Sequence, residues 1–126
     1  MNHEIKIRFD AKTRQWRVQN LRRKVLPGDT VTWTLVTNRR DVAARFQFPF
    51  GDVFRRGVTR DWTARIVPTL DKKGLSGNTL TLTVARHAYN GANPRYYAVW
   101  IVDSRFRAGG VYAIGDNPPP EFEVGP

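Results

Sequence analysis

The chain has 126 residues, of which 40% are hydrophobic and 25% are charged, so it can form one domain, residues 1–126, around a hydrophobic core. It contains no cysteine, which excludes disulfides and thiolate metal sites. Its net charge of +10, with arginine at 16 of the 21 basic positions, favours anionic partners, although scattered arginines also serve solubility alone.

The first third of the chain alternates apolar and polar residues, which is the pattern of half-buried β-strands. Strands are predicted over residues 4–9 and 15–19, with a turn at 10–13 between them. The strongest strand prediction is residues 31–37, which are rich in β-branched side chains and follow a Pro-Gly-Asp turn at 27–29.

Residues 38–65 depart from this alternation. They combine many arginines with glycine and proline, and five aromatic side chains lie among them: Phe46, Phe48, Phe50, Phe54 and Trp62. We predict a long excursion that contains one or two short strands and a helical turn. A connection of this length in a compact domain is usually functional or has structure of its own.

The second half of the chain returns to short strands. The predicted elements are, in order, a polar turn at 71–78, a strand at 79–84, a turn at 90–94, a central and doubly buried strand at 95–102, a loop at 105–116 and a closing strand at 121–124. Short strands at this spacing predict an all-β, antiparallel sandwich.

Three segments, in order along the chain, resemble the cupredoxins, small β-sandwich proteins that bind copper. Residues 25–33 resemble the turn into a core strand of that family, residues 96–102 its penultimate strand, and residues 121–124 its closing strand. The resemblance implies a Greek-key connection of the strands. The predicted fold class is therefore an all-β, antiparallel Greek-key β-sandwich of the cupredoxin-like kind.

The resemblance does not extend to the copper ligands of the family. Residues 45–48, where one histidine ligand would lie, read Arg-Phe-Gln-Phe, and residues 103–110 contain none of the other family ligands. A blue-copper centre requires two histidines and a cysteine. We therefore expect no metal ligand and no cofactor, and the former metal end of the fold is expected to hold aromatic and arginine side chains.

The regions outside the strand pattern, residues 38–65 and 103–116, define a predicted loop pole. The leading hypothesis is a non-catalytic interaction module that binds a protein partner through this loop pole, because phenylalanine and arginine often anchor interfaces. The predicted partner-binding residues are Phe46, Phe48, Phe54, Arg105, Phe106 and Arg107.

The alternative hypothesis is a protein that binds nucleic acid or another polyanion. Basic side chains near aromatic rings suit single-stranded nucleic acid, although no known nucleic-acid-binding motif occurs. The predicted polyanion-binding residues are Arg22, Arg23, Lys24, Arg39, Arg40, Arg55 and Arg56. A carbohydrate-binding surface built from the tryptophans and Tyr96-Tyr97 is a further possibility. This possibility is weakened because Trp16, Trp33 and Trp100 are predicted to belong to the core.

The two histidines, His3 and His87, offer little material for catalysis, and no nucleotide-binding or hydrolase motif occurs, so we expect no enzyme and no catalytic residue. Met1-Asn2-His3 resembles the amino-terminal motif that binds Cu(II) or Ni(II), unless His3 simply begins the first strand. The chain has no membrane-spanning segment and no signal-peptide core. A cytoplasmic protein is therefore expected, unless a leader has been removed.

Overall fold

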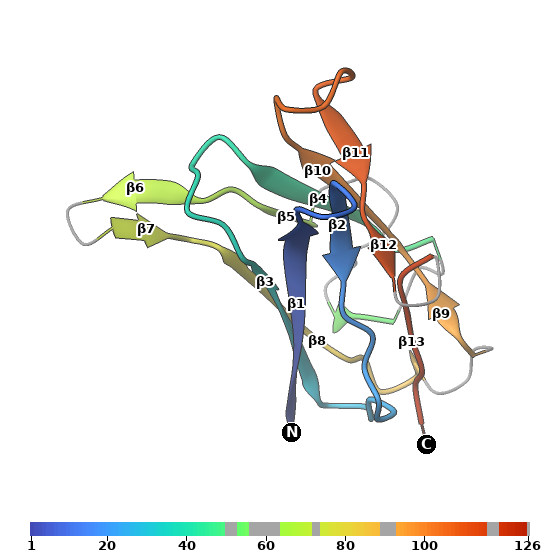
Figure 1. Ribbon diagram of the computed structural model, residues 1–126. Coiled ribbons are helices and arrows are strands. Elements are labelled where there is room, and N and C mark those ends of the chain that lie inside the picture. Colours follow the sequence, from blue (N-terminus) through green and yellow to red (C-terminus); the bar gives the residue numbers. More distant parts are fainter. Residues whose placement is uncertain (50–52, 56–63, 72–73, 89–92, 116–118, 126) are drawn as a thin grey trace.

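Two β-sheets face each other across the hydrophobic core in the computed structural model, which describes residues 1–49, 53–55, 64–71, 74–88, 93–115 and 119–125 (Figure 1). Within these residues, sheet I contains, in spatial order, β12 (Ile114–Gly115), β2 (Gln15–Val18), β1 (Asn2–Asp10), β3 (Thr30–Leu35) and β8 (Thr79–Thr83). Sheet II contains β11 (Gly110–Tyr112), β10 (Ala98–Val102), β4 (Ala43–Gln47) and β5 (Ala64–Ile66). The all-β prediction is confirmed.

Two short strand pairs accompany the sheets. β9 (Arg95–Tyr96) pairs with β13 (Glu121–Phe122), and β6 (Thr69–Asp71) pairs with β7 (Gly74–Ser76). The closing strand predicted near the carboxyl end is therefore present. The polar turn predicted at 71–78 is wrong in part, because β6 and β7 form a hairpin across it.

The expectation of purely antiparallel sheets is also wrong, because β1 pairs in parallel with β3 and β12 pairs in parallel with β2. The reason is the path of residues 19–29, which carry the chain past the start of β1 and let β3 run in the same direction on its other side. Gly28 completes this path with φ of +89° in a turn closed by a 2.9 Å bond from the Asp29 N–H to the Leu26 carbonyl.

The core is formed by the inward residues of both sheets and has Trp33 at its centre. The ring of Trp33 lies 5.5 to 5.9 Å from the rings of Phe46, Phe48, Phe54 and Tyr97, all of which are buried. The indole N–H of Trp33 donates a 3.1 Å hydrogen bond to the Tyr97 hydroxyl, which satisfies the polar atom that a buried indole brings with it.

Two predicted elements of the second half are divided differently in the structure. Residues 95–102 separate at Tyr97 into β9 and β10, and β10 occupies the predicted central position between β11 and β4. The prediction of a doubly buried strand is wrong, because only one face of β10 is fully buried. The predicted loop at 105–116 contains β11 and β12, which pass from sheet II to sheet I. Trp16 and Trp33 are buried as predicted, whereas Trp100 is only half-buried and lies outside the core.

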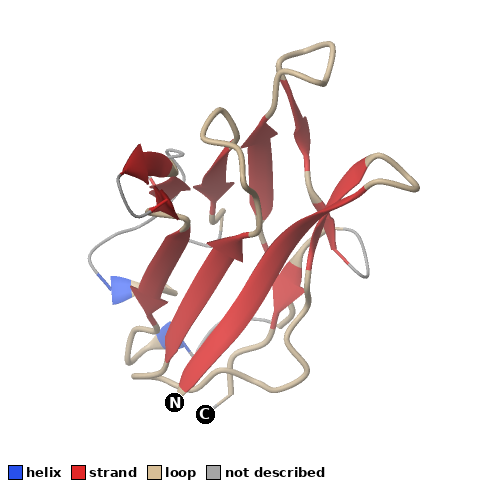
Figure 2. Cartoon of the chain, turned by 60° about the vertical axis from the view of Figure 1, so that its left-hand side comes forward, coloured by secondary structure: helices blue, strands red, loops and turns tan. Residues whose placement is uncertain are grey.

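The connections gather at two ends of the molecule, and both views show the same arrangement (Figures 1 and 2). The upper end holds the loops of residues 11–14, 36–42 and 103–109, and the lower end holds residues 19–29 with both termini. In the part of the chain that the structure describes, no helix has the length and hydropathy needed to cross a bilayer.

Candidate functional site

The outer face of sheet II carries a row of four large side chains, one from each strand. Strand register places Tyr112 opposite Trp100, Trp100 opposite Arg45, and Arg45 opposite Arg65. Side chains alternate along a strand, so these four point away from the core while their neighbours Val99, Ile101 and others point inward. Adjacent strands are about 4.8 Å apart, so the row extends over about 14 Å.

The aromatic half of the row depends on Gly110. A methyl group on this residue would lie 2.7 Å from atoms of the Trp100 indole and 2.5 Å from the Ile101 carbonyl oxygen. The indole of Trp100 therefore rests directly on the backbone of β11. Tyr112 meets it edge to face, with 4.9 Å between the ring centroids, and remains 56% exposed.

The basic half of the row places like charges side by side. Arg45 and Arg65 are both exposed, and no carboxylate among the described residues lies within ion-pair distance of either guanidinium. Sheet I contains a comparable pair, Arg8 opposite Arg17, but there Asp10 accepts an ion pair from Arg17 at 3.3 Å. Like charges directly opposite each other destabilise a sheet, and only the second pair has a compensating carboxylate within the described chain.

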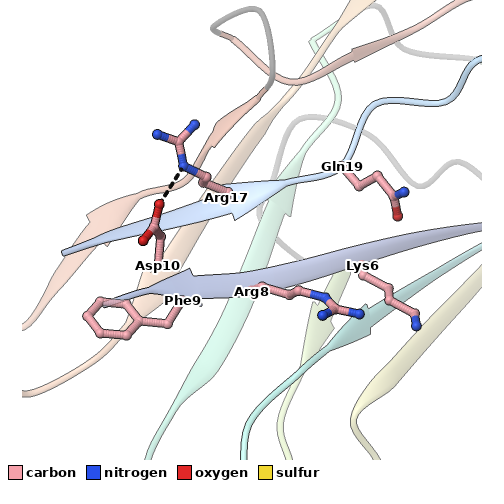
Figure 3. A pocket seen from close by; sticks show the side chains of 6 residues that line it. All are labelled: Lys6, Arg8, Phe9, Asp10, Arg17 and Gln19. Carbon is pink, nitrogen blue, oxygen red and sulfur yellow. Dashed lines mark ion pairs between the residues drawn. The ribbon is translucent and has the colours of Figure 1, made fainter. Parts of the chain in front are cut away.

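A second basic surface lies on the outer face of sheet I, where β1 and β2 form a cleft of about 500 Å³ (Figure 3). Figure 3 shows Lys6 and Arg8 beside each other on β1, while Arg17 points toward Asp10. Its lining residues are Lys6, Arg8, Phe9, Asp10, Arg17 and Gln19. The cleft thus holds three cations and one carboxylate, and it lies across the sandwich from the sheet II row.

A buried carboxylate organises the 103–109 loop at the upper end. Asp103 is fully buried, and its oxygens accept hydrogen bonds from the Arg105 guanidinium at 2.7 to 3.2 Å and from the Trp16 indole at 3.0 Å. Burial by itself raises the pKa of Asp103, but the bonds from Arg105 and Trp16 outweigh it and hold the pKa at about 2. The guanidinium of Arg105 also lies 4.2 Å above the Phe9 ring.

The structure contradicts three of the six predicted partner-binding residues. Phe46, Phe48 and Phe54 are at most 2% exposed, so the prediction that they meet a partner is wrong, because hydrophobic burial has placed all three in the core around Trp33. Arg105 is engaged with Asp103, and Phe106 is half-buried against the core. Arg105 and Arg107 are both exposed, and of these two Arg107 has no partner among the described residues.

The predicted polyanion-binding residues are split between the two ends of the molecule. Arg22, Arg23 and Lys24 are exposed at the lower end, whereas Arg39 and Arg40 lie at the upper end, where Arg39 pairs with Asp41 at 2.7 Å. β3 separates the two ends by about 20 Å.

Arg55 is exposed and lies toward the lower end of the molecule. The preceding residue, Phe54, forms a β-bridge with Val84, and the Val84 N–H donates a hydrogen bond to the Asp29 carbonyl at that end. Arg56 lies outside the described residues. The predicted set is therefore not one continuous surface.

The amino terminus begins the first strand. His3 lies within β1, with its Nε2 atom 2.8 Å from Asp29 Oδ2, and the terminal amine lies 3.2 Å from Asp29 Oδ1. The hydrogen bonds from His3 and from the Leu26 N–H lower the pKa of Asp29 to about 2. Among the described residues, no three His, Cys, Asp or Glu side chains gather as metal ligands.

No protein-family model matches the chain, and neither a curated protein nor a solved structure shows significant similarity to it. The sheet II row therefore has to be judged on its own geometry. Sequence reasoning missed this row. Alternation does place Arg45 and Arg65 outward, but their pairing with each other depends on a register that joins residues 18 to 22 positions apart in the chain.

Proposed function

We propose that the protein is a non-catalytic binding module for a polyanion and that its contact surface is the outer face of sheet II. The observation that carries this proposal is the placement of Arg45 directly opposite Arg65, both exposed and without a carboxylate partner in the described chain. Such a pair costs folding stability. A bound anion between the two guanidinium groups removes the repulsion, and guanidinium groups match phosphate and sulfate oxygens well.

The surroundings of the arginine pair support an anionic ligand. The outward positions of sheet II carry no acidic residue, since they are Ala43, Arg45, Gln47, Arg65, Ala98, Trp100, Val102, Gly110 and Tyr112. The net charge of +10 adds long-range attraction for a polyanion. A symmetric dimer through this face is disfavoured, because a twofold axis would bring two arginine pairs together without carboxylates.

The protein-binding loop pole is the weaker proposal. Its three core phenylalanines are buried, and Arg105 already neutralises Asp103. Within the loops of residues 36–42 and 103–109, Arg40 and Arg107 are the exposed cations without an ion-pair partner among the described residues. We propose that these two arginines help to attract the polyanion.

We also propose that the sandwich is a Greek-key, cupredoxin-like fold without its copper site. The support is the order of its parts: a Pro-Gly turn into the core strand β3, the central strand β10, and the closing strand β13. Phe46, in the segment where the family would place a histidine ligand, packs on Trp33 instead. Because the chain contains no cysteine, this fold cannot supply the thiolate of a blue-copper centre.

The polyanion proposal is tested by the fluorescence anisotropy of a labelled heparin oligosaccharide at increasing salt. Heparin supplies anionic groups without nucleobases, so it isolates the contribution of charge. We expect Arg45→Gln with Arg65→Gln to weaken binding at least about tenfold and to reduce the slope of log affinity against log salt by about 1 to 2 units, because two anion contacts are lost.

The matched control is Arg22→Gln with Arg23→Gln, which removes the same charge at the lower end of the molecule. We expect this control to weaken binding less and to leave most of the salt slope in place. Equal losses in the two double variants would show that charge over the whole surface, rather than the sheet II row, binds the ligand. Absence of salt-dependent binding by the unmodified protein would overturn the polyanion proposal itself.

A further inference from the structure

The sheet II row combines two kinds of group that a simple anion site does not need together. Arg45 and Arg65 provide the charge, whereas Trp100 and Tyr112 provide aromatic surface in the same line across the sheet. Tyr112 is 56% exposed, and neither ring belongs to the hydrophobic core. Tyr112 therefore presents exposed aromatic surface in the same row as the arginines.

The neighbouring outward positions of sheet II carry uncharged side chains, most of them small. Ala43 and Val102 lie on one side of it, and Ala98 and Gln47 lie on the other. Gly110 lets the Trp100 indole lie against the sheet rather than stand away from it. A ligand that reaches both ends of the row must be extended over about 14 Å and must carry planar groups as well as negative charges.

We propose that the ligand of this face is a single-stranded nucleic acid, with bases stacked on Trp100 and Tyr112 and phosphates bound by Arg45 and Arg65. This inference rests on the polyanion-binding function proposed above and specifies its ligand. In a duplex the bases are stacked on each other, so their faces do not reach a protein ring. An unpaired strand presents base faces and phosphates together, and aromatic platforms beside basic groups bind it with little dependence on sequence.

The experiment compares three probes at one salt concentration: a labelled oligothymidylate of about 15 nucleotides, a DNA duplex of equal length, and the heparin oligosaccharide. We expect the oligothymidylate to bind more tightly than the duplex. We also expect Tyr112→Ala to weaken oligothymidylate binding at least about fivefold, as loss of one stacked base does. The same variant should leave the affinity for heparin within about twofold.

Two further variants separate stacking from folding. Tyr112→Phe keeps the ring and should retain the affinity for oligothymidylate. Tyr96→Ala is the matched control, because Tyr96 is 46% exposed on β9, which pairs with β13 and not with sheet II, and its loss should change no affinity. Quenching of tryptophan emission on oligothymidylate binding, reduced in Trp100→Phe, would locate the bases at the indole.

The outcomes distinguish this inference from the broader function. If all three probes bind alike and Tyr112→Ala changes none of them, the single-stranded ligand is wrong while the polyanion function stands. If Tyr96→Ala weakens oligothymidylate binding as much as Tyr112→Ala, the sheet II row is not the base-binding site, and the inference is overturned. If no probe binds even at low salt, both proposals fall.

Discussion

The buried carboxylate of Asp103 accepts a 3.0 Å hydrogen bond from the indole nitrogen of Trp16, a residue 87 positions earlier in the chain. This bond joins the loop after β10 to β2 and thus connects sheet II to sheet I. Asp103 also accepts the N–H of Arg105 at 3.0 Å, in addition to its guanidinium. One buried carboxylate thereby fixes the conformation of the whole 103–109 loop.

Asp103→Asn should destabilise the fold, because the amide offers the Arg105 guanidinium no charge. A pKa of about 2 against the ordinary value of 3.8 corresponds to about 2 kcal/mol, or a fall in Tm of about 5 to 10 °C for a domain of this size. Thermal unfolding by circular dichroism measures the shift. Asp41→Asn is the control, because Asp41 is in an exposed ion pair with Arg39 and its loss should leave Tm nearly unchanged.

The stability of the protein should decrease in acid over a defined range of pH. The pKa values of Asp29 and Asp103 are lowered to about 2 in the folded state, so both carboxylates contribute stability above their unfolded pKa, near 3.8. That contribution is lost as the pH falls from about 4 to about 2. Melting temperatures between pH 7 and pH 2.5 should therefore be level above pH 5 and decrease steeply below pH 4.

The double variant Asp29→Asn with Asp103→Asn separates these two groups from the other carboxylates. It should be less stable at pH 7 and should lose less of its remaining stability between pH 5 and pH 2.5. An acid-dependent decrease as large as that of the unmodified protein would show that other carboxylates control the transition.

The strand pattern of the sequence was a sound guide where one face of a strand is buried. Ile5, Ile7, Val31 and Trp33 occupy alternate positions, and all four face the core. The same pattern carries no information on strand neighbours, since alternation is identical in parallel and antiparallel sheets. The parallel pairing of β1 with β3 follows from the path of residues 19–29 and was therefore missed.

The candidate site was predicted less well, because exposure is a property of the whole fold. Phe48 lies in a segment of mixed composition, yet its ring stacks within the core at 5.6 Å from Trp33. Trp100 has apolar neighbours on both sides in the sequence, yet it points outward beside Tyr112. A tryptophan at an outward position of a strand becomes visible only once the register of β10 with its neighbours is known.

Gly110→Ala should disturb the Trp100 position without touching the arginines. The added methyl group would meet the Ile101 carbonyl at 2.5 Å and the indole at 2.7 Å, so the ring or β11 must move. Such overpacking costs about 1 to 3 kcal/mol. We expect a lower Tm and a shifted tryptophan emission maximum. Gly125→Ala is the control, because its methyl group would meet only the flexible Leu26 and Lys24 side chains.

The Arg45 and Arg65 pair predicts that stability and ligand binding change in opposite directions. Arg65→Glu places a carboxylate opposite Arg45 and converts a repulsive cross-strand pair into an attractive one. Tm should therefore rise by about 1 to 4 °C, while the affinity for polyanions falls more than about tenfold. Arg65→Gln should have an intermediate effect on both quantities. A decrease in Tm for both variants would mean that Arg65 stabilises the sheet through contacts of its own, and the arginine pair would then no longer indicate an anion-binding site.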